Sequence, residues 1–103
     1  MKPMSSRYAL MLGEDGMIKD DGIVCKFSDK HFIVTTTSGG APKVLADMEE
    51  YLQTEWPNLQ VYVNSITEQF STFNISGPKS REIVSKVFTD VDFSNDKFPF
   101  MTF

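Results

Sequence analysis

The stretch RYALMLGEDGMIKDDGIVCKFSDKHFIVTTT, residues 7–37, decides the fold. Large apolar residues fill positions 7–12, and the Gly-Glu-Asp-Gly run after them is typical of a turn, because glycine accepts a positive φ at little cost. A second strand is expected to begin at 17–19, to be interrupted by Asp-Asp-Gly, and to resume at 23–27, where apolar and polar residues alternate. Beyond a short turn, β-branched residues favour a third strand at 31–37.

Two helices are predicted downstream, and each begins at a proline, whose missing N–H costs nothing in the first turn. They span Pro42–Thr54 and Pro78–Phe88, and in both the apolar residues recur on one helical face that should pack inward. Between them, the patterns at 59–63 and 66–75 predict two further strands, and residues 98–103 resemble the beginning of another. The outline is ββα-ββα, which favours an α+β fold whose antiparallel sheet carries both helices on one face.

The composition indicates a soluble globular chain of one domain. It has 103 residues, 41% apolar and 23% charged, with a net charge of −4. No lysine or arginine stripe alternates with aromatic residues, which argues against nucleic-acid binding, and no apolar run has the ~20 residues of a membrane span. Residues 1–6 lack the apolar core of a signal peptide and are expected to form a loose tail before a domain at 7–103. A single cysteine excludes an internal disulfide and is compatible with the cytoplasm.

The pair Asp20-Asp21 is the first candidate for chemistry, because two carboxylates in different environments can divide acid and base roles. Neighbouring residues of a strand point to opposite faces, so at most one of the two can be catalytic if the segment is extended. The alternative is a solvated turn pair that hydrogen-bonds the local backbone, and the residues alone favour it.

Three further patterns have functional and structural interpretations. The run Thr35–Gly40 could present N–H groups to an anion at a helix N-terminus, or it could simply lead a strand into a helix; residues 77–80 are similar. Neither run has the Gly-Lys-Ser/Thr ending of a P-loop. Cys25 and His31 could pair as nucleophile and base across a hairpin, but Cys25 alternates with apolar neighbours and is better explained as a core residue. These two residues alone cannot complete a zinc site, so no metal is expected.

A family resemblance gives these patterns a reaction. The run from Arg7 to Gly16, followed by Asp-Asp-Gly, resembles the folate-binding segment of the aminomethyltransferase superfamily, which includes the glycine cleavage T proteins. Further runs resemble the alpha subunit of heterotetrameric sarcosine oxidase: residues 35–40, 52–57, 65–69, 77–82 and 98–101. The resemblance extends from about residue 7 to residue 103 and keeps the order of the motifs.

The resemblance implies roles for individual residues. By that match Asp21 is the catalytic carboxylate beside the reacting nitrogens of tetrahydrofolate, Asp20 is its neighbour in the folate site, and Tyr8 is an aromatic residue near the folate. The tyrosine that T proteins carry on the strand after the aspartate pair is replaced here by Cys25, which favours the oxidase branch. The implied cofactor is tetrahydrofolate, with flavin and NAD bound in other parts of the enzyme.

The implied reaction is oxidative demethylation of sarcosine, with one-carbon transfer to tetrahydrofolate giving 5,10-methylene-tetrahydrofolate and glycine. The family module is considerably longer than this chain, so we expect a partial domain that is inactive alone, associates with the other sarcosine oxidase subunits and can self-associate through exposed strand edges. Two alternatives remain. One is a non-catalytic α+β binding or assembly module that keeps the fold. The other, a folate-binding repair protein of iron–sulfur assembly, is disfavoured because the cysteine-bearing signature of that group is not seen.

Overall fold

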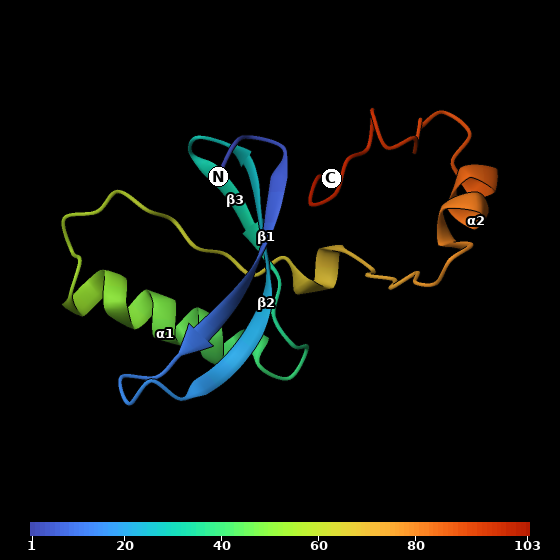
Figure 1. Cartoon of the computed structure of the whole chain (residues 1–103). Coiled ribbons are helices and arrows are strands. Elements are labelled where there is room, and N and C mark those ends of the chain that lie inside the picture. Colours follow the sequence, from blue (N-terminus) through green and yellow to red (C-terminus); the bar gives the residue numbers. More distant parts are fainter.

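Three antiparallel strands form the sheet in the computed structural model, which describes residues 1–103. They are β1 (Ser5–Leu12), β2 (Ile18–Ser28) and β3 (His31–Val34), and they lie in the order β1-β2-β3 (Figure 1). The strand β2 runs through the aspartate pair without the interruption that the sequence suggests. The strand β3 is shorter than expected, because the chain leaves the regular ladder after Val34.

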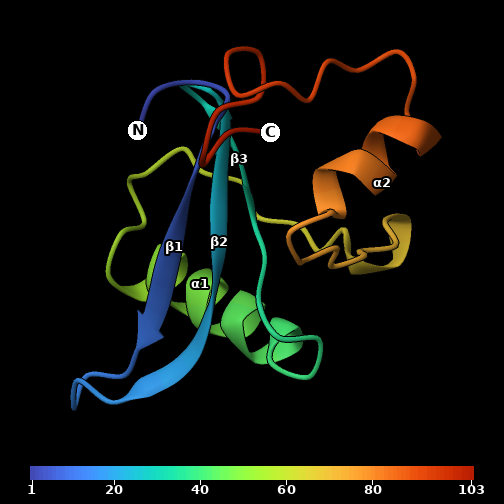
Figure 2. The same cartoon turned by 45° about the vertical axis from the view of Figure 1, so that its right-hand side comes forward.

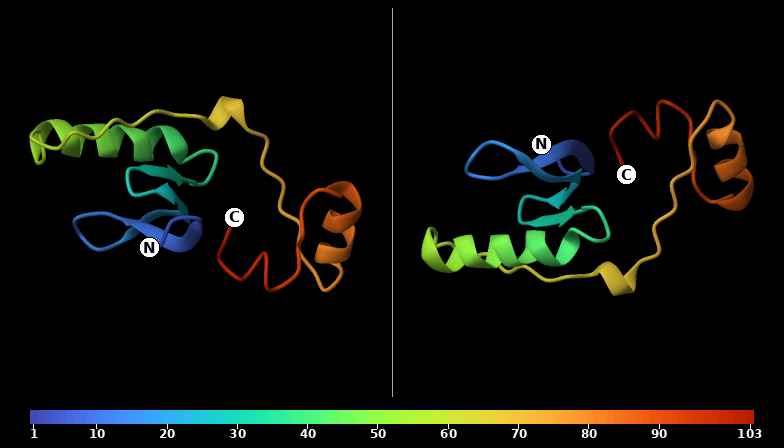
Figure 3. Two further views of the ribbon diagram at one scale, coloured as in Figure 1. Left: turned by 90° about the horizontal axis from the view of Figure 1, so that it is seen from above. Right: turned by 90° about the horizontal axis from the view of Figure 1, so that it is seen from below.

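Two α-helices follow the sheet, α1 (Ala41–Thr54) and α2 (Ser80–Val87), with a short 3₁₀ turn, η1 (Thr67–Gln69), between them. The helix α1 has its proline in the first turn, as expected, and runs beside the sheet (Figure 1, Figure 3). An antiparallel sheet with two helices confirms the predicted α+β class. No helix of the structure combines the length and the apolar character needed to span a membrane.

The helix α1 supplies the small core of the molecule. Val44 is buried, and the other apolar residues of its inward face, Leu45, Met48, Tyr51 and Leu52, are half-buried. An ion pair between Lys19 on β2 and Asp47 on α1, 2.9 Å long, ties the helix to the sheet at its solvent-accessible margin. Such a partly exposed pair contributes ~1 kcal/mol at most, so it is a minor part of what holds α1 in place.

The second half of the chain departs from the predicted ββα-ββα order. The strands expected at 59–63 and 66–75 are absent: residues 60–65 and 70–76 form no backbone–backbone hydrogen bonds, and η1 interrupts the second segment. Alternating side chains make a segment compatible with a sheet, but a strand exists only when a partner supplies the ladder. No such partner lies beside these residues, so the pattern alone did not produce strands.

The predicted placement of both helices on one face of the sheet is also wrong for α2. This helix stands away from the sheet (Figure 1, Figure 3), and its expected inward residues Ile83, Val87 and Phe88 are exposed. The Cα radius of gyration is 16.3 Å, whereas a compact domain of this length has ~13 Å. The apolar pattern of α2 therefore marks a surface that nothing in this chain covers.

The end of the chain returns to the beginning of β1 (Figure 2). Ser5 and Thr102 form an isolated antiparallel bridge, the Ser6 N–H donates to the Met101 carbonyl at 2.8 Å, and the ring centroids of Phe27 and Phe103 lie 4.6 Å apart. The strand expected at 98–103 is reduced to this one bridge. The expected tail is also shorter, because β1 already includes Ser5 and Ser6, and Ser6 is buried.

Candidate functional site

Tyr8 and Asp21 form a hydrogen-bonded pair on the face of the sheet opposite Asp20. The Tyr8 hydroxyl donates to Asp21 Oδ2 at 2.7 Å. The register explains the contact: Asp21 lies opposite Leu10, and Tyr8 is two residues from Leu10 on the same strand, so all three side chains share one face. Tyr8 is 58% exposed, which leaves the pair accessible to a ligand.

The carboxylate of Asp21 changes the chemistry of the phenol. The hydrogen bond to Asp21 is the main cause that raises the pKa of Tyr8 above its ordinary value of 10.0, with desolvation and the negative charge of Asp21 adding to it. The phenol therefore stays protonated and keeps donating to the carboxylate at neutral pH. The remaining lone pairs of the Asp21 carboxylate can accept a hydrogen bond or a proton from a bound molecule.

Asp20 has the opposite environment. It lies across the ladder from Met11, on the other face, and its residue is only 6% exposed. Its carboxylate accepts three hydrogen bonds: the Asp21 N–H at 2.8 Å, the Thr37 N–H at 3.2 Å and the Thr37 hydroxyl at 3.0 Å. The bond from the Asp21 N–H is the main cause that lowers the pKa of Asp20 below its ordinary value of 3.8; burial opposes it, and the Thr37 bonds assist it. The sequence argument that neighbouring strand residues face opposite ways is confirmed by this register.

The run Thr35–Gly40 does contact an anion, but the anion belongs to the protein itself. Asp20 accepts the Thr37 N–H, and the Gly40 and Ala41 N–H groups are used within the turn by the Thr37 carbonyl. A carboxylate near a helix N-terminus is also favoured by the helix dipole. The turn before α1 is therefore occupied by a side chain of β2.

Cys25 and His31 are not arranged as a nucleophile and its base. Cys25 pairs with Ile33 across the ladder, is half-buried, and has a pKa raised by that burial, which opposes formation of the thiolate. His31 instead stacks on Phe27, with ring centroids 5.1 Å apart. The structure holds no group of three or more His, Cys, Asp or Glu side chains arranged for a metal ion.

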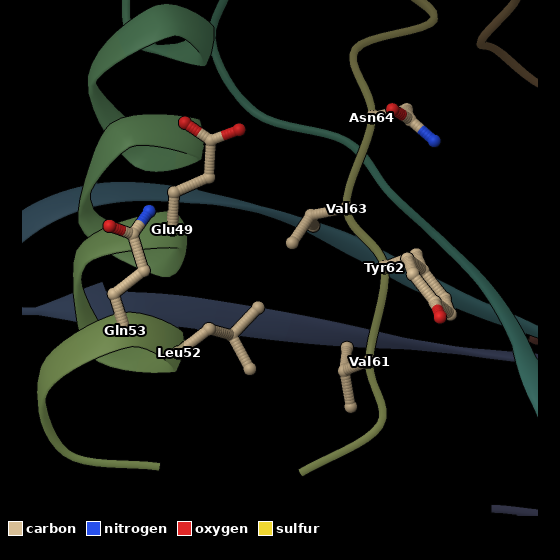
Figure 4. A pocket seen from close by; sticks show the side chains of 7 residues that line it. All are labelled: Glu49, Leu52, Gln53, Val61, Tyr62, Val63 and Asn64. Carbon is tan, nitrogen blue, oxygen red and sulfur yellow. The ribbon is translucent and has the colours of Figure 1, made fainter. Parts of the chain in front are cut away.

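Two shallow hollows lie near α1, and neither includes Tyr8 or Asp21. One, of 420 Å³, surrounds the Lys19–Asp47 ion pair. The other, of 270 Å³, separates α1 from the extended segment at 61–64 (Figure 4), and its lining residues are Glu49, Leu52, Gln53, Val61, Tyr62, Val63 and Asn64. The pair Tyr8–Asp21 lies outside both hollows, and the exposure of Tyr8 places it on an open face, which can form one wall of a ligand site.

The sequence reasoning missed the residues that hold Asp20. Thr37 supplies two donors to it, and Gly40 packs against its carboxylate so closely that a Cβ would overlap Oδ2. Gly22 similarly packs against the Thr35 carbonyl oxygen. The two glycines were visible as Asp-Asp-Gly and Ser-Gly-Gly, but no local pattern connects residues so far apart in the chain.

Together, the sheet, the helix beside it and the open carboxylate–phenol pair define an α+β module with an accessible polar pair on one face of its sheet. The family model described as the GCVT N-terminal domain matches residues 1–103, and the chain belongs to this family.

The chain is similar to proteins named sarcosine oxidase subunit alpha and aminomethyltransferase. It is 47% identical over 103 residues to sarcosine oxidase subunit alpha of Corynebacterium sp. (strain P-1), covering 100% of this chain and 11% of that protein. It is 43% identical over 96 residues to the subunit of that name from Rhizobium meliloti (strain 1021), covering 93% of this chain and 10% of that protein. An aminomethyltransferase of Koribacter versatilis is 31% identical over 97 residues, covering 94% of this chain and 24% of that protein. The chain thus spans about a tenth of the length of these oxidase subunits.

Proposed function

We propose that this chain is part of a folate-dependent one-carbon-transfer enzyme and that Asp21, supported by Tyr8, faces tetrahydrofolate. The observation that carries the proposal is the 2.7 Å hydrogen bond between these two side chains on an accessible face. The similarity to sarcosine oxidase alpha subunits and aminomethyltransferases supports it. The finer proposal is the oxidase reaction: oxidative demethylation of sarcosine, giving glycine and 5,10-methylene-tetrahydrofolate.

The residues present fit one side of a folate. Leu10 is 47% exposed beside the pair and offers an apolar surface to a flat heterocycle, while the Asp21 carboxylate accepts hydrogen bonds from ring or bridge N–H groups. Tetrahydrofolate, when bound, supplies the nucleophilic nitrogens that accept the one-carbon unit. Asp21 takes up the proton released there and stabilises developing positive charge, and the Tyr8 hydroxyl holds the carboxylate in place.

In this proposal flavin and NAD bind to other parts of the enzyme. The rest of the module and the other subunits cover apolar side chains that this chain leaves exposed. Tyr62 is 93%, Phe73 82% and Phe100 91% exposed. Covering such large apolar side chains removes apolar surface from water, which favours association with a partner. The chain without these partners is proposed to self-associate. The proposed compartment is the cytoplasm.

The same exposure favours a second candidate function, a non-catalytic assembly module that keeps the fold and binds through those side chains. The two candidates differ in what Asp21 does. In the complete enzyme that contains this chain, Asp21→Asn should strongly reduce formation of methylene-tetrahydrofolate and leave the assembly of subunits unchanged. If Asp21→Asn kept full product formation, the assembly function would replace the catalytic one.

A further inference from the structure

The ladder between β2 and β3 ends at Val34, but the chain stays close to β2 for three more residues. Just beyond the end, the Thr35 N–H donates to the Ile23 carbonyl at 2.9 Å, and the Ile23 N–H donates to Thr35 Oγ1 at 2.8 Å. A side-chain oxygen has thus already replaced one ladder carbonyl. The next β2 amide on this side belongs to Asp21, two residues before Ile23, because alternate N–H groups point the same way.

The carboxylate of Asp20 takes the place of the missing strand carbonyl at this position. Its Oδ1 accepts the Asp21 N–H at 2.8 Å from β2 and the Thr37 N–H at 3.2 Å from the returning chain. One oxygen therefore joins β2 and the returning chain at a point beyond their last backbone–backbone hydrogen bond, from the Thr35 N–H to the Ile23 carbonyl. Its Oδ2 accepts the Thr37 hydroxyl at 3.0 Å, which fixes the orientation of the carboxylate.

Two glycines make this arrangement sterically possible. A Cβ at residue 22 would overlap the Thr35 carbonyl oxygen, so Gly22 permits the close approach of the returning chain. A Cβ at residue 40 would overlap Oδ2 of Asp20 and crowd Thr37 Oγ1, so Gly40 leaves the space that the carboxylate fills. The space is matched to aspartate, since the longer side chain of glutamate would have to enter the volume of the Gly40 turn.

We propose that Asp20 is a positioning residue for Asp21: it fixes the Asp21 backbone amide from one face of the sheet, so that the Asp21 carboxylate stays directed at the Tyr8 hydroxyl on the other. Asp20 itself is buried and lies on the face of the sheet opposite the Tyr8–Asp21 pair. The consequence for catalysis rests on the proposed function, whereas the positioning does not, and the two are tested separately.

The test follows Tyr8 and two backbone amides by NMR in the full chain, without folate. The ¹³Cζ shift of Tyr8 reports its pKa, which Asp21 raises. Asp20→Ala should lower the pKa of Tyr8 toward 10.0, while Asp20→Asn, whose Oδ1 can still accept both amides, should keep most of the shift. Asp21→Asn is the control that must remove the shift. The positioning role would be overturned if the pKa of Tyr8 were unchanged in Asp20→Ala. It would also be overturned if the Ala and Asn variants lowered the pKa of Tyr8 equally.

The wild-type chain provides a measurement that needs no folded mutant. Lowering the pH through the pKa of Asp20 should move the amide proton shifts of Asp21 and Thr37 together, with one midpoint below 3.8, because one carboxylate accepts both. Different midpoints for the two amides would contradict a shared hydrogen bond to the Asp20 carboxylate. The proposed function is tested separately in the complete enzyme: full formation of the folate product by Asp21→Asn, together with an intact Tyr8 response in the chain, would reject the proposed function and leave the positioning role standing.

Discussion

Gly40 packs against the carboxylate of Asp20 with no room for a β-carbon between them. The neighbouring Gly39 has open space around the same position and no positive φ. The contact thus joins the turn before α1 to the strand β2, and it gives a matched pair of glycines with which to measure how much the contact matters.

Gly40→Ala should destabilise the chain by about 1–3 kcal/mol, because the new methyl group forces the Asp20 carboxylate away from Thr37. Gly39→Ala should be neutral or stabilise by about 0.4–1 kcal/mol, because it only restricts the unfolded chain. Urea denaturation followed by circular dichroism measures both. Similar stabilities for the two variants would show that the Asp20–Gly40 contact does not constrain the fold.

Asp21→Asn in the complete enzyme should reduce formation of methylene-tetrahydrofolate ~10²-fold or more, the usual scale for a positioned acid–base group. Reduction of the flavin by the amine should change little, because that step is proposed to occur elsewhere. Asp20→Asn should have a smaller effect, since the asparagine keeps the two amide contacts of Oδ1. Rapid-mixing measurements of flavin reduction, with a separate assay of the folate product, distinguish the steps. Equal losses in the two variants would contradict this division of roles.

The stability of the chain should fall in acid through Asp20. Its pKa is lower in the folded chain than the ordinary 3.8, so its contribution is complete above 3.8 and disappears as the pH drops through the folded value. Asp20→Asn should therefore show a weaker dependence of unfolding free energy on pH below 4 than the wild type. Asp29 and Asp92 also have lowered pKa values, from Lys26 and Ser94 respectively, but they are present in both proteins and cancel in the comparison. If the unfolding free energies of the wild type and Asp20→Asn changed in parallel with pH, Asp20 would be excluded as the cause of the loss of stability in acid.

The isolated chain should bind tetrahydrofolate more weakly than ~1 mM and should self-associate. Tyr8 and Asp21 form one wall only, and a net charge of −4 opposes an anionic ligand. The outer edge of β1 beyond Ser6 and the unpaired segments 60–65 and 70–76 offer free backbone groups to a second copy. Calorimetric titration and light scattering test the two expectations. Micromolar binding by a monomer would mean that these residues already form a complete pocket.

Amide hydrogen exchange should divide the chain in two. The amides of β2 that lie between β1 and β3 should exchange slowly, whereas residues 60–65 and 70–76 should exchange almost as fast as an unfolded peptide, because they have no backbone hydrogen bonds. Slow exchange in the second group would indicate that these segments pair in solution, within one chain or between copies. Repeating the measurement over a range of concentrations separates these two cases.

The sequence by itself determined the first hairpins, the helix α1 and the opposite orientation of Asp20 and Asp21. These features depend on the period of apolar residues and on turn residues within a few positions of one another, which one sequence displays directly. The tertiary structure decided which aspartate is buried, because Thr37 and Gly40, 17 and 20 residues beyond Asp20, supply its donors and its space. It also decided that residues 59–63 and 66–75 form no strands, because a strand needs a partner across the ladder, and alternation along one segment carries no information about that partner.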